Sequence, residues 1–206
     1  MLSSVTLDAL TLSRGGRVLL RDLSLTLGAG EALALSGANG AGKTTLLRAI
    51  AGFIRPDAGA IGYRGTDGAA LEPETARRHL HLLGHHEGLK GARTARDELR
   101  FQAEWLGEGG GIGAAADALG LGPVLGLETR RLSAGQRRRV SLARLVSAPR
   151  CLWLLDEPLA PLDARWRDVA RALMARHLSE GGMIIAAVHD PLDLPARSLD
   201  LSQVSS

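Results

Sequence analysis

The chain has 206 residues, of which 45% are hydrophobic and 23% are charged, and its formal net charge is +3 at pH 7. This length predicts one domain with a large core, and the composition is that of a soluble globular protein. No apolar run approaches the roughly 18 residues of a membrane span, and the first residues lack the basic and apolar regions of a secretory signal. The single cysteine, Cys151, excludes an internal disulfide.

The first part of the chain predicts strands around one helix. Alternating apolar residues predict strands at 5–12 and 23–27, and Gly15-Gly16 predicts the hairpin turn that joins them in antiparallel fashion. The elements expected next are a buried strand at 31–36, a helix from Lys43 to about Gly52, a strand at 59–63, a short helix at 72–78 and a strand at 79–84.

The second part predicts a helical block followed by two buried strands. The expected elements are a helix at 95–106, a glycine-rich loop at 108–113, a weak helix at 114–119, a helix at 133–147, a strand at 151–155, a helix at 164–179, a strand at 183–188 and a short strand after Arg197. The runs at 151–155 and 183–188 are continuously apolar, which is typical of parallel strands buried on both faces. The alternation predicts an α/β fold with a mainly parallel sheet core, N-terminal antiparallel strands and an inserted α-helical subdomain.

The segment SGANGAGKTT, at 36–45, fits the phosphate-loop pattern G-x-x-x-x-G-K-[ST] between a strand and a helix. Its glycines allow successive backbone N–H groups to curl around a phosphate, and the helix adds its positive end. Lys43 would reach the β- and γ-phosphates of ATP, and Thr44 would offer a hydroxyl to Mg²⁺. The residues expected in this loop are Gly37, Ala38, Asn39, Gly40, Ala41, Gly42, Lys43, Thr44 and Thr45. A glycine-rich turn that binds nothing is the alternative.

Two acids and a histidine follow predicted strands. Asp156 and Glu157 come directly after an apolar strand, where one acid would hold Mg²⁺ and its neighbour would orient the attacking water. The alternative interpretation is a pair of helix caps. His189 comes after the last buried strand and is a candidate contact to a γ-phosphate, although an isolated histidine there is more often structural.

Ser133, Gly135 and Gln136 lie at the start of a predicted helix. They form either an ordinary helix cap or a second anion-binding nest. Two phosphate nests in one small chain are redundant for a monomer. The second nest makes sense if it serves the nucleotide of a neighbouring subunit.

The order of GANGAGKTT, LSAGQ, LLDEP and a histidine after a strand resembles the ATP-binding-cassette ATPases over nearly the whole chain. The resemblance implies one P-loop NTPase domain, with a RecA-like core at 1–84 and 148–206 and an inserted helical subdomain at 85–147. The roles that it implies are phosphate binding for 37–45, the signature motif for 133–136, metal binding for Asp156, the catalytic base for Glu157, a switch histidine for His189 and a partner-facing carboxylate for Asp163.

Two positions depart from this family pattern. His85 stands where the family usually has a glutamine, in the loop that enters the helical subdomain. A histidine there would contact metal-bound water or a γ-phosphate, as the glutamine would, but with a charge that depends on pH. Arg14 stands where the family usually stacks an aromatic residue against adenine, so a guanidinium would take that position.

A narrower resemblance rests on LGHH at 83–86, on the segment 132–145 and on GGMIIAAVH at 181–189. These are similar to the ATP-binding subunits of the bacterial haem exporters that serve cytochrome c maturation. The resemblance implies a peripheral ATPase on the cytoplasmic face of the inner membrane, an ATP-dependent homodimer, membrane partners of the CcmB and CcmC kind, and release of the haem chaperone CcmE. The alternatives are another exporter, or a soluble cassette ATPase that acts on DNA or ribosomes.

Two side-chain clusters invite other functions. His79, His81, His85 and His86 suggest direct binding of a metal or haem, but no cysteine or paired carboxylate completes such a site. The arginines at 137–139 suggest nucleic acid, but a solvated helix face is the preferred interpretation, and no nucleic-acid partner is expected.

Overall fold

The computed structural model describes residues 1–107, 111–189 and 191–203. The strands are β1 (Leu2–Arg14), β2 (Arg17–Gly28), β3 (Ala32–Ser36), β4 (Ala58–Gly65), β5 (Leu80–Leu83), β6 (Leu152–Asp156), β7 (Met183–Ala187) and β8 (Arg197–Asp200). The α-helices are α1 (Lys43–Ile50), α2 (Pro73–Arg77), α3 (Ala95–Trp105), α4 (Ile112–Ala118), α5 (Ala134–Ser147) and α6 (Ala164–Ser179). Short 3-10 turns are η1 (Gly122–Val124), η2 (Thr129–Arg131) and η3 (Leu201–Gln203).

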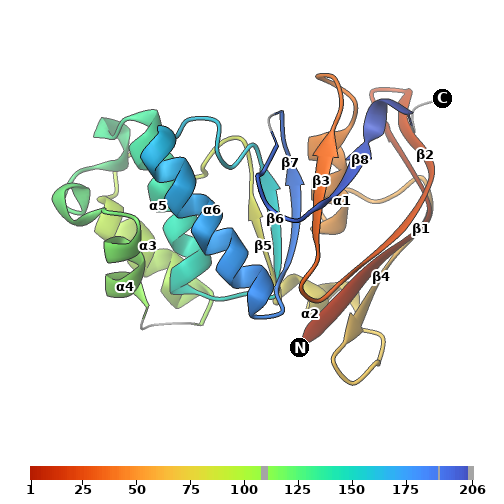
Figure 1. The fold of residues 1–206 in the computed structure, drawn as a ribbon, viewed down its shortest axis with the longest axis horizontal. Coiled ribbons are helices and arrows are strands. Elements are labelled where there is room, and N and C mark those ends of the chain that lie inside the picture. The colour runs from red at the N-terminus through yellow and green to blue at the C-terminus, as the bar shows by residue number, and fades with distance from the viewer. Residues whose placement is uncertain (108–110, 190, 204–206) are drawn as a thin grey trace.

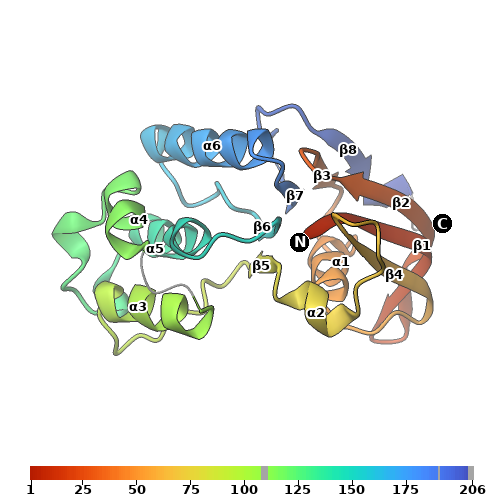
Figure 2. The ribbon, with the colours of Figure 1, turned by 90° about the horizontal axis from the view of Figure 1, so that it is seen from below.

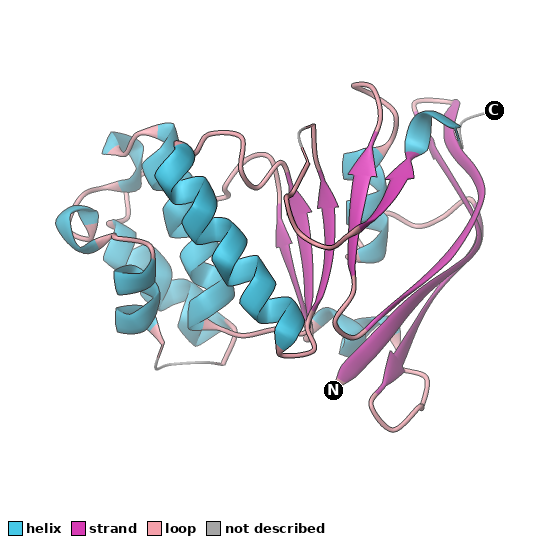
Figure 3. Ribbon diagram, viewed as in Figure 1, coloured by secondary structure: helices cyan, strands magenta, loops and turns pink. Residues whose placement is uncertain are grey.

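The strands form two sheets. One is antiparallel with the order β2-β1-β4, and the other is parallel with the order β5-β6-β7-β3-β8. Figure 1 shows the parallel strands in the middle of the molecule, with the antiparallel sheet on one side and α3, α4 and α5 on the other. The same division into a helical side and a strand-rich side is clear in Figure 3. The predicted α/β fold, with its parallel core and antiparallel N-terminal strands, is confirmed.

Strands β6 and β7 divide the interior into two cores. Because side chains alternate along a strand, Leu152 and Leu154 pack into a cluster with α1 and the antiparallel sheet, whereas Trp153 and Leu155 pack against α3 to α6. Figure 2 shows α1 and α6 on opposite sides of these strands. This burial of both faces explains the uninterrupted apolar runs in the sequence.

The predicted boundaries differ from the structure mainly at loops. The hairpin strands extend well beyond the predicted ranges, because polar residues on their outer faces continue the pairing of β1 with β2. The glycine-rich loop expected at 108–113 is shorter at its end, since α4 already begins at Ile112. Residues 108–110 of that loop lie outside the described residues.

His81 is a structural residue of the core. It is 8% exposed, and its Nε2 donates a hydrogen bond to the carbonyl oxygen of Ala148, 2.6 Å away. Burial lowers the pKa of His81 to about 4, because the imidazolium form is poorly solvated there. In the part of the chain that the structure describes, no group of three or more His, Cys, Asp and Glu side chains could hold a metal ion.

We expect the neutral form of His81 to make stability depend on pH. Its pKa is lowered on folding, so the unfolded chain binds more protons between about pH 6.5 and pH 4, and stability falls as the pH falls through this window. Between pH 7.5 and pH 5 this side chain should account for about 2 kcal/mol of lost unfolding free energy. Urea unfolding of the wild type and of His81→Gln at both pH values measures the difference, and an equal loss in both proteins would exclude this role.

Candidate nucleotide-binding and catalytic site

The loop between β3 and α1 has the backbone of a phosphate cradle. Gly37, Gly40 and Gly42 have φ values of 124°, 85° and 101°, a region that side chains with a Cβ rarely adopt. Gly42 is also the N-cap of α1 and provides no side-chain cap, so N–H groups at the start of the helix are left for another acceptor. The Nζ of Lys43 donates to the carbonyl oxygen of Gly37 and, at 3.3 Å, to that of Ala38. The ammonium group therefore lies folded over the loop, where it would help to neutralise the charge of bound phosphates.

One wall of this cradle comes from the β1–β2 hairpin. Arg14, at the end of β1, lines the same pocket as Leu19 and residues 40–45. The structure thus brings Arg14 to the phosphate loop, as the family pattern implied. Leu19 was missed by the sequence analysis; a Cβ at Gly42 would lie 3.3 Å from its side chain, so loop and hairpin are in close contact.

A second unpredicted neighbour of the loop is the C-terminal turn η3. The backbone N–H of Ala38 donates to the Oγ of Ser202 over 3.4 Å, and the N–H of Ser202 donates to Asp200 over 2.9 Å. The sequence gives no signal for this contact, because it depends on β8 pairing beside β3. The phosphate loop is therefore supported at Ala38 by residues that are distant from it in the sequence.

The side chains of Thr44 and Asp156 meet at the ends of α1 and β6. The Thr44 hydroxyl donates to Oδ2 of Asp156 over 2.8 Å, and Asp156 is 4% exposed. A hydroxyl and a carboxylate oxygen are ligands that suit Mg²⁺, which usually completes its coordination with water and substrate phosphates. The pair fits a magnesium site that needs the nucleotide to complete it.

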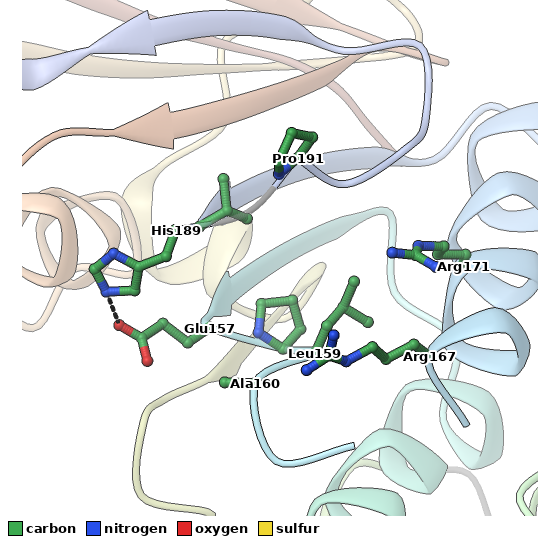
Figure 4. A pocket seen from close by; sticks show the side chains of 9 residues that line it. Glu157, Leu159, Ala160, Arg167, Arg171, His189 and Pro191 are labelled. Atoms are coloured by element: carbon green, nitrogen blue, oxygen red, sulfur yellow. Dashed lines mark ion pairs between the residues drawn. The ribbon is translucent and has the colours of Figure 1, made fainter. Parts of the chain in front are cut away.

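Glu157 lies between two histidines. Its Oε1 is 2.8 Å from Nε2 of His189, and its Oε2 is 3.6 Å from Nδ1 of His85. Figure 4 shows the contact of Glu157 with His189 at the edge of a pocket. The backbone of Glu157 has φ 50°, an uncommon left-handed conformation that turns the chain directly after β6. The structure thus brings three of the predicted site residues together, with the largely exposed ring of His85 near the carboxylate.

The same pocket contains residues that the sequence analysis did not single out. Arg167 and Arg171 of α6 line it together with Glu157 and His189 (Figure 4). The Nε of Arg167 donates to the carbonyl of Leu162 over 2.9 Å, and Arg171 pairs with Asp193 at 2.7 Å. In a chain so rich in arginine, spacing alone gives no reason to select these two.

The segment 133–136 opens α5 with a capping box. The Ser133 hydroxyl accepts from the N–H of Gln136, and the Gln136 side chain accepts from the N–H of Ser133. A Cβ at Gly135 would approach the carbonyl oxygen of Pro161 to 3.0 Å, so the start of α5 lies against the segment that leads to Asp163. Asp163 caps α6 by accepting from the N–H of Trp166 over 3.0 Å.

The phosphate loop and the start of α5 belong to different sides of the molecule. Figures 1 and 2 both place α1 and α5 on opposite sides of β5, β6 and β7. Within one chain, therefore, the segment 133–136 lies apart from the loop between β3 and α1.

The interpretation of 137–139 as a solvated helix face is wrong. Arg138 is 2% exposed, and its guanidinium donates to the carbonyl oxygens of Gly84 and His85. Arg139 donates to the carbonyls of Leu119 and Gly120. The physical reason is that neighbouring loops leave carbonyl oxygens without strand or helix partners, and long arginine side chains satisfy them.

Comparison with known proteins agrees with this site. The model of the ABC transporter family matches residues 20–160. A protein of Rhodopseudomonas palustris strain BisB5, named cytochrome c biogenesis ATP-binding export protein CcmA, is 46% identical over 188 residues, which cover 90% of this chain and 92% of that protein. A protein of the same name from Maricaulis maris strain MCS10 is 44% identical over 200 residues, or 96% of this chain and 92% of that protein.

Solved structures show the same fold. A putative ABC transporter ATP-binding protein from Pyrococcus furiosus superimposes with a TM-score of 0.83 at 23% identity, over 99% of this chain and 100% of that one. The phosphate loop, Asp156, Glu157 and the capped start of α5 all lie within the residues that the family model matches. The chain belongs to the ABC transporter family, as one of its ATP-binding subunits.

Proposed function

We propose that the chain hydrolyses ATP to ADP and phosphate with the help of Mg²⁺, and that it does so in a haem-export complex that serves cytochrome c maturation. The observation that carries the hydrolysis is the position of Glu157, held by His189 beside the Thr44–Asp156 pair. The cytochrome c assignment is supported by relatives that are 42–46% identical over most of the chain and are named CcmA.

Binding of ATP begins at the phosphate loop. The N–H groups at the start of α1 would donate to the phosphate oxygens, and the Lys43 ammonium would exchange the carbonyls of Gly37 and Ala38 for the β- and γ-phosphates. Thr44 and Asp156 would hold Mg²⁺, which would neutralise charge that develops on the phosphate oxygens. Arg14, which lines the same pocket, would stack its guanidinium on adenine.

Glu157 would orient the attacking water and accept its proton. A carboxylate performs this role only if its position is fixed, and the 2.8 Å contact with His189 holds one of its two oxygens. His189 is about half exposed, so its ring is free to turn toward a γ-phosphate when one is present. The backbone turns at Glu157 through a left-handed conformation, so the acid that would activate water directly follows the acid that would hold the metal.

The segment 133–136 would act on the nucleotide of a second copy. The start of α5 offers backbone N–H groups to an anion, but it lies on the opposite side of the parallel strands from α1 of its own chain. A homodimer would place this segment against the phosphate loop of its partner and would sandwich two ATP molecules. Asp163, which directly follows the segment in contact with Gly135, would face the partner.

In the described part of the chain, no helix has both the length and the apolar composition needed to cross a membrane.

A groove beside β5 and α3 presents exposed aromatic side chains. Phe53 and Trp105 are 73% and 79% exposed, and they line this groove with Leu82 and Arg144. We assign the groove to membrane subunits of the CcmB and CcmC kind, which would place the chain on the cytoplasmic face of the inner membrane. Arg144 also donates to the carbonyl of Glu87, so a docked subunit that contacts Arg144 would be linked through it to the loop that carries His85.

Membrane co-fractionation tests this assignment. The chain should sediment with membranes, and mass spectrometry of the intact complex should identify integral membrane subunits and a haem chaperone. The alternative is a soluble cassette ATPase that acts on DNA or ribosomes; it predicts recovery in the soluble fraction and a shift of nucleic acid on a gel. If the chain is found with the membrane subunits of a different exporter, the proposed ATP hydrolysis stands and the haem assignment is refuted.

The loop residue His85 gives a sharper prediction. His85→Gln restores the usual family residue within reach of Glu157, so ATP binding and much of the hydrolysis should remain. His85→Ala should keep ATP binding but separate hydrolysis from cytochrome c maturation. The adjacent His86 is also exposed, and no contact with Glu157 is seen for it in the described structure, so His86→Ala is the matched control.

Both activities decide the outcome. ATPase rate and holocytochrome c yield are measured for His85→Gln, His85→Ala and His86→Ala in the same membranes. A loss of yield with His86→Ala alone would move the functional position by one residue. Full yield with both alanine variants would mean that this loop does not couple hydrolysis to maturation.

A further inference from the structure

Three arginines of α5 reach into one irregular loop. Arg138 donates through its two terminal nitrogens to the carbonyl oxygens of Gly84 and His85, over 3.1 and 3.3 Å. Arg144 donates to the carbonyl of Glu87 over 3.2 Å, and Arg137 approaches the Glu87 carboxylate at 4.0 Å. Residues 84–87 form neither helix nor strand, so contacts from outside the loop must fix its position.

Arg138 is the most constrained of these residues. Its side chain is 2% exposed, which is rare for an arginine without a specific structural task. Burial lowers the pKa of its guanidinium, while the carboxylates of Glu87, Asp156 and Glu157 act in the opposite direction and favour the charged form. The buried cation is thus held by hydrogen bonds to the loop and favoured by the charges of the nearby acids.

The loop that Arg138 holds carries a residue of the site. The Nδ1 of His85 lies 3.6 Å from Oε2 of Glu157, on the opposite carboxylate oxygen from His189. The ring of His85 is largely exposed, so few contacts of its own keep it there. Two hydrogen bonds from one planar guanidinium to consecutive carbonyls fix both the position and the orientation of the backbone at His85.

The geometry points to Arg138 as a positioning residue, which holds the 84–87 loop so that His85 stays against Glu157. Because Arg138 lies five residues after Ser133, the N-cap of the same helix, and about 7.5 Å along its axis, a shift at the start of α5 carries the guanidinium and the loop with it. The start of α5 and the carboxylate of Glu157 are thereby mechanically linked. This inference rests on the proposed function, in which the segment 133–136 meets the nucleotide of a partner and Glu157 activates water.

The competing explanation is that Arg138 only fills space between α5 and the loop. A residue that only fills space would change the amount of folded protein. A positioning residue would change the coupling of hydrolysis to maturation through His85. The two are separated by a double-mutant cycle, because substitutions that act through one shared contact do not add. The measured quantity is the holocytochrome c formed per ATP hydrolysed in membranes that contain the intact complex.

Arg138→Met roughly keeps the volume of the side chain but removes the guanidinium that donates to the two carbonyls. We expect it to lower this coupling ratio roughly tenfold to a hundredfold, as small misplacements near a reacting centre do, without a change in KM for ATP. Combining Arg138→Met with His85→Ala should lower the ratio no further than either change alone. Arg139→Met is the matched control on the same helix, because Arg139 holds Leu119 and Gly120 instead of the loop, and its effect should multiply with that of His85→Ala.

Two results would overturn the inference: an unchanged coupling ratio in Arg138→Met, or effects of Arg138→Met and His85→Ala that multiply. If Arg138→Met does not fold, Arg138→Lys decides, since it keeps the charge but cannot bridge two carbonyls; a wild-type ratio in that variant would equally refute the role. Glu157→Gln is measured in parallel. Normal hydrolysis in Glu157→Gln would refute the proposed function itself, independently of Arg138.

Discussion

Lys43→Ala is expected to abolish ATP hydrolysis and to weaken ATP binding. The Lys43 side chain is 8% exposed, and its ammonium donates to the carbonyls of Gly37 and Ala38, which it can exchange for phosphate oxygens. Losing one electrostatic contact to a charge that develops in the transition state typically costs on the order of 10²–10³ in rate. Steady-state ATPase activity of the purified complex, together with the Kd for a fluorescent ATP analogue, measures both effects.

The chain offers a clean control for this substitution. Lys90 is the only other lysine in the sequence, and its side chain is exposed at the surface. Lys90→Ala should therefore keep wild-type turnover and affinity. Near-normal turnover of Lys43→Ala would remove this residue from the site.

Glu157→Gln should separate ATP binding from hydrolysis. The amide keeps the size of the side chain but cannot accept a proton, and a general base contributes typically 10²–10⁴ to the rate. The phosphate loop and the Thr44–Asp156 pair are untouched, so ATP–Mg²⁺ should still bind. The expected product is a closed homodimer that persists because its nucleotide is not hydrolysed.

Light scattering after size exclusion follows this dimer, with and without saturating ATP–Mg²⁺. Glu74→Gln, at an exposed position of α2, controls for the change of charge. If Glu157→Gln remains monomeric with ATP–Mg²⁺, both alone and with its membrane subunits, the sandwich of two copies is wrong. Rapid hydrolysis by the variant would instead assign the base to another residue.

The main elements of this fold could be predicted from the sequence because their signals are local. The glycines of the phosphate loop, the cap at Ser133 and the apolar runs of β6 and β7 each fix a short segment by its own backbone chemistry. The order of these segments then places Thr44 beside Asp156, which the structure confirms as a contact of 2.8 Å. The contact of His189 with Glu157 follows from the pairing of β6 with β7 in the same way.

Contacts that depend on long side chains between distant segments could not be predicted. The hydrophilic run at 137–139 has the composition of a solvated surface, and only the tertiary structure shows that Arg138 is buried under the loop at 84–87. The support of Ala38 by Ser202 is likewise invisible until β8 pairs with β3. The sequence also contains 25 lysine and arginine residues, so no single arginine stands out before its partners are known.

The central claim is that this chain uses the ATP site around Glu157 to drive cytochrome c maturation. The most direct measurement is the holocytochrome c yield, by haem staining, of a bacterium whose own copy is replaced by Glu157→Gln. The variant is expected to assemble in the membrane at the wild-type level, and holocytochrome c is expected to be lost. A normal yield from cells that contain only the assembled Glu157→Gln variant would contradict the claim.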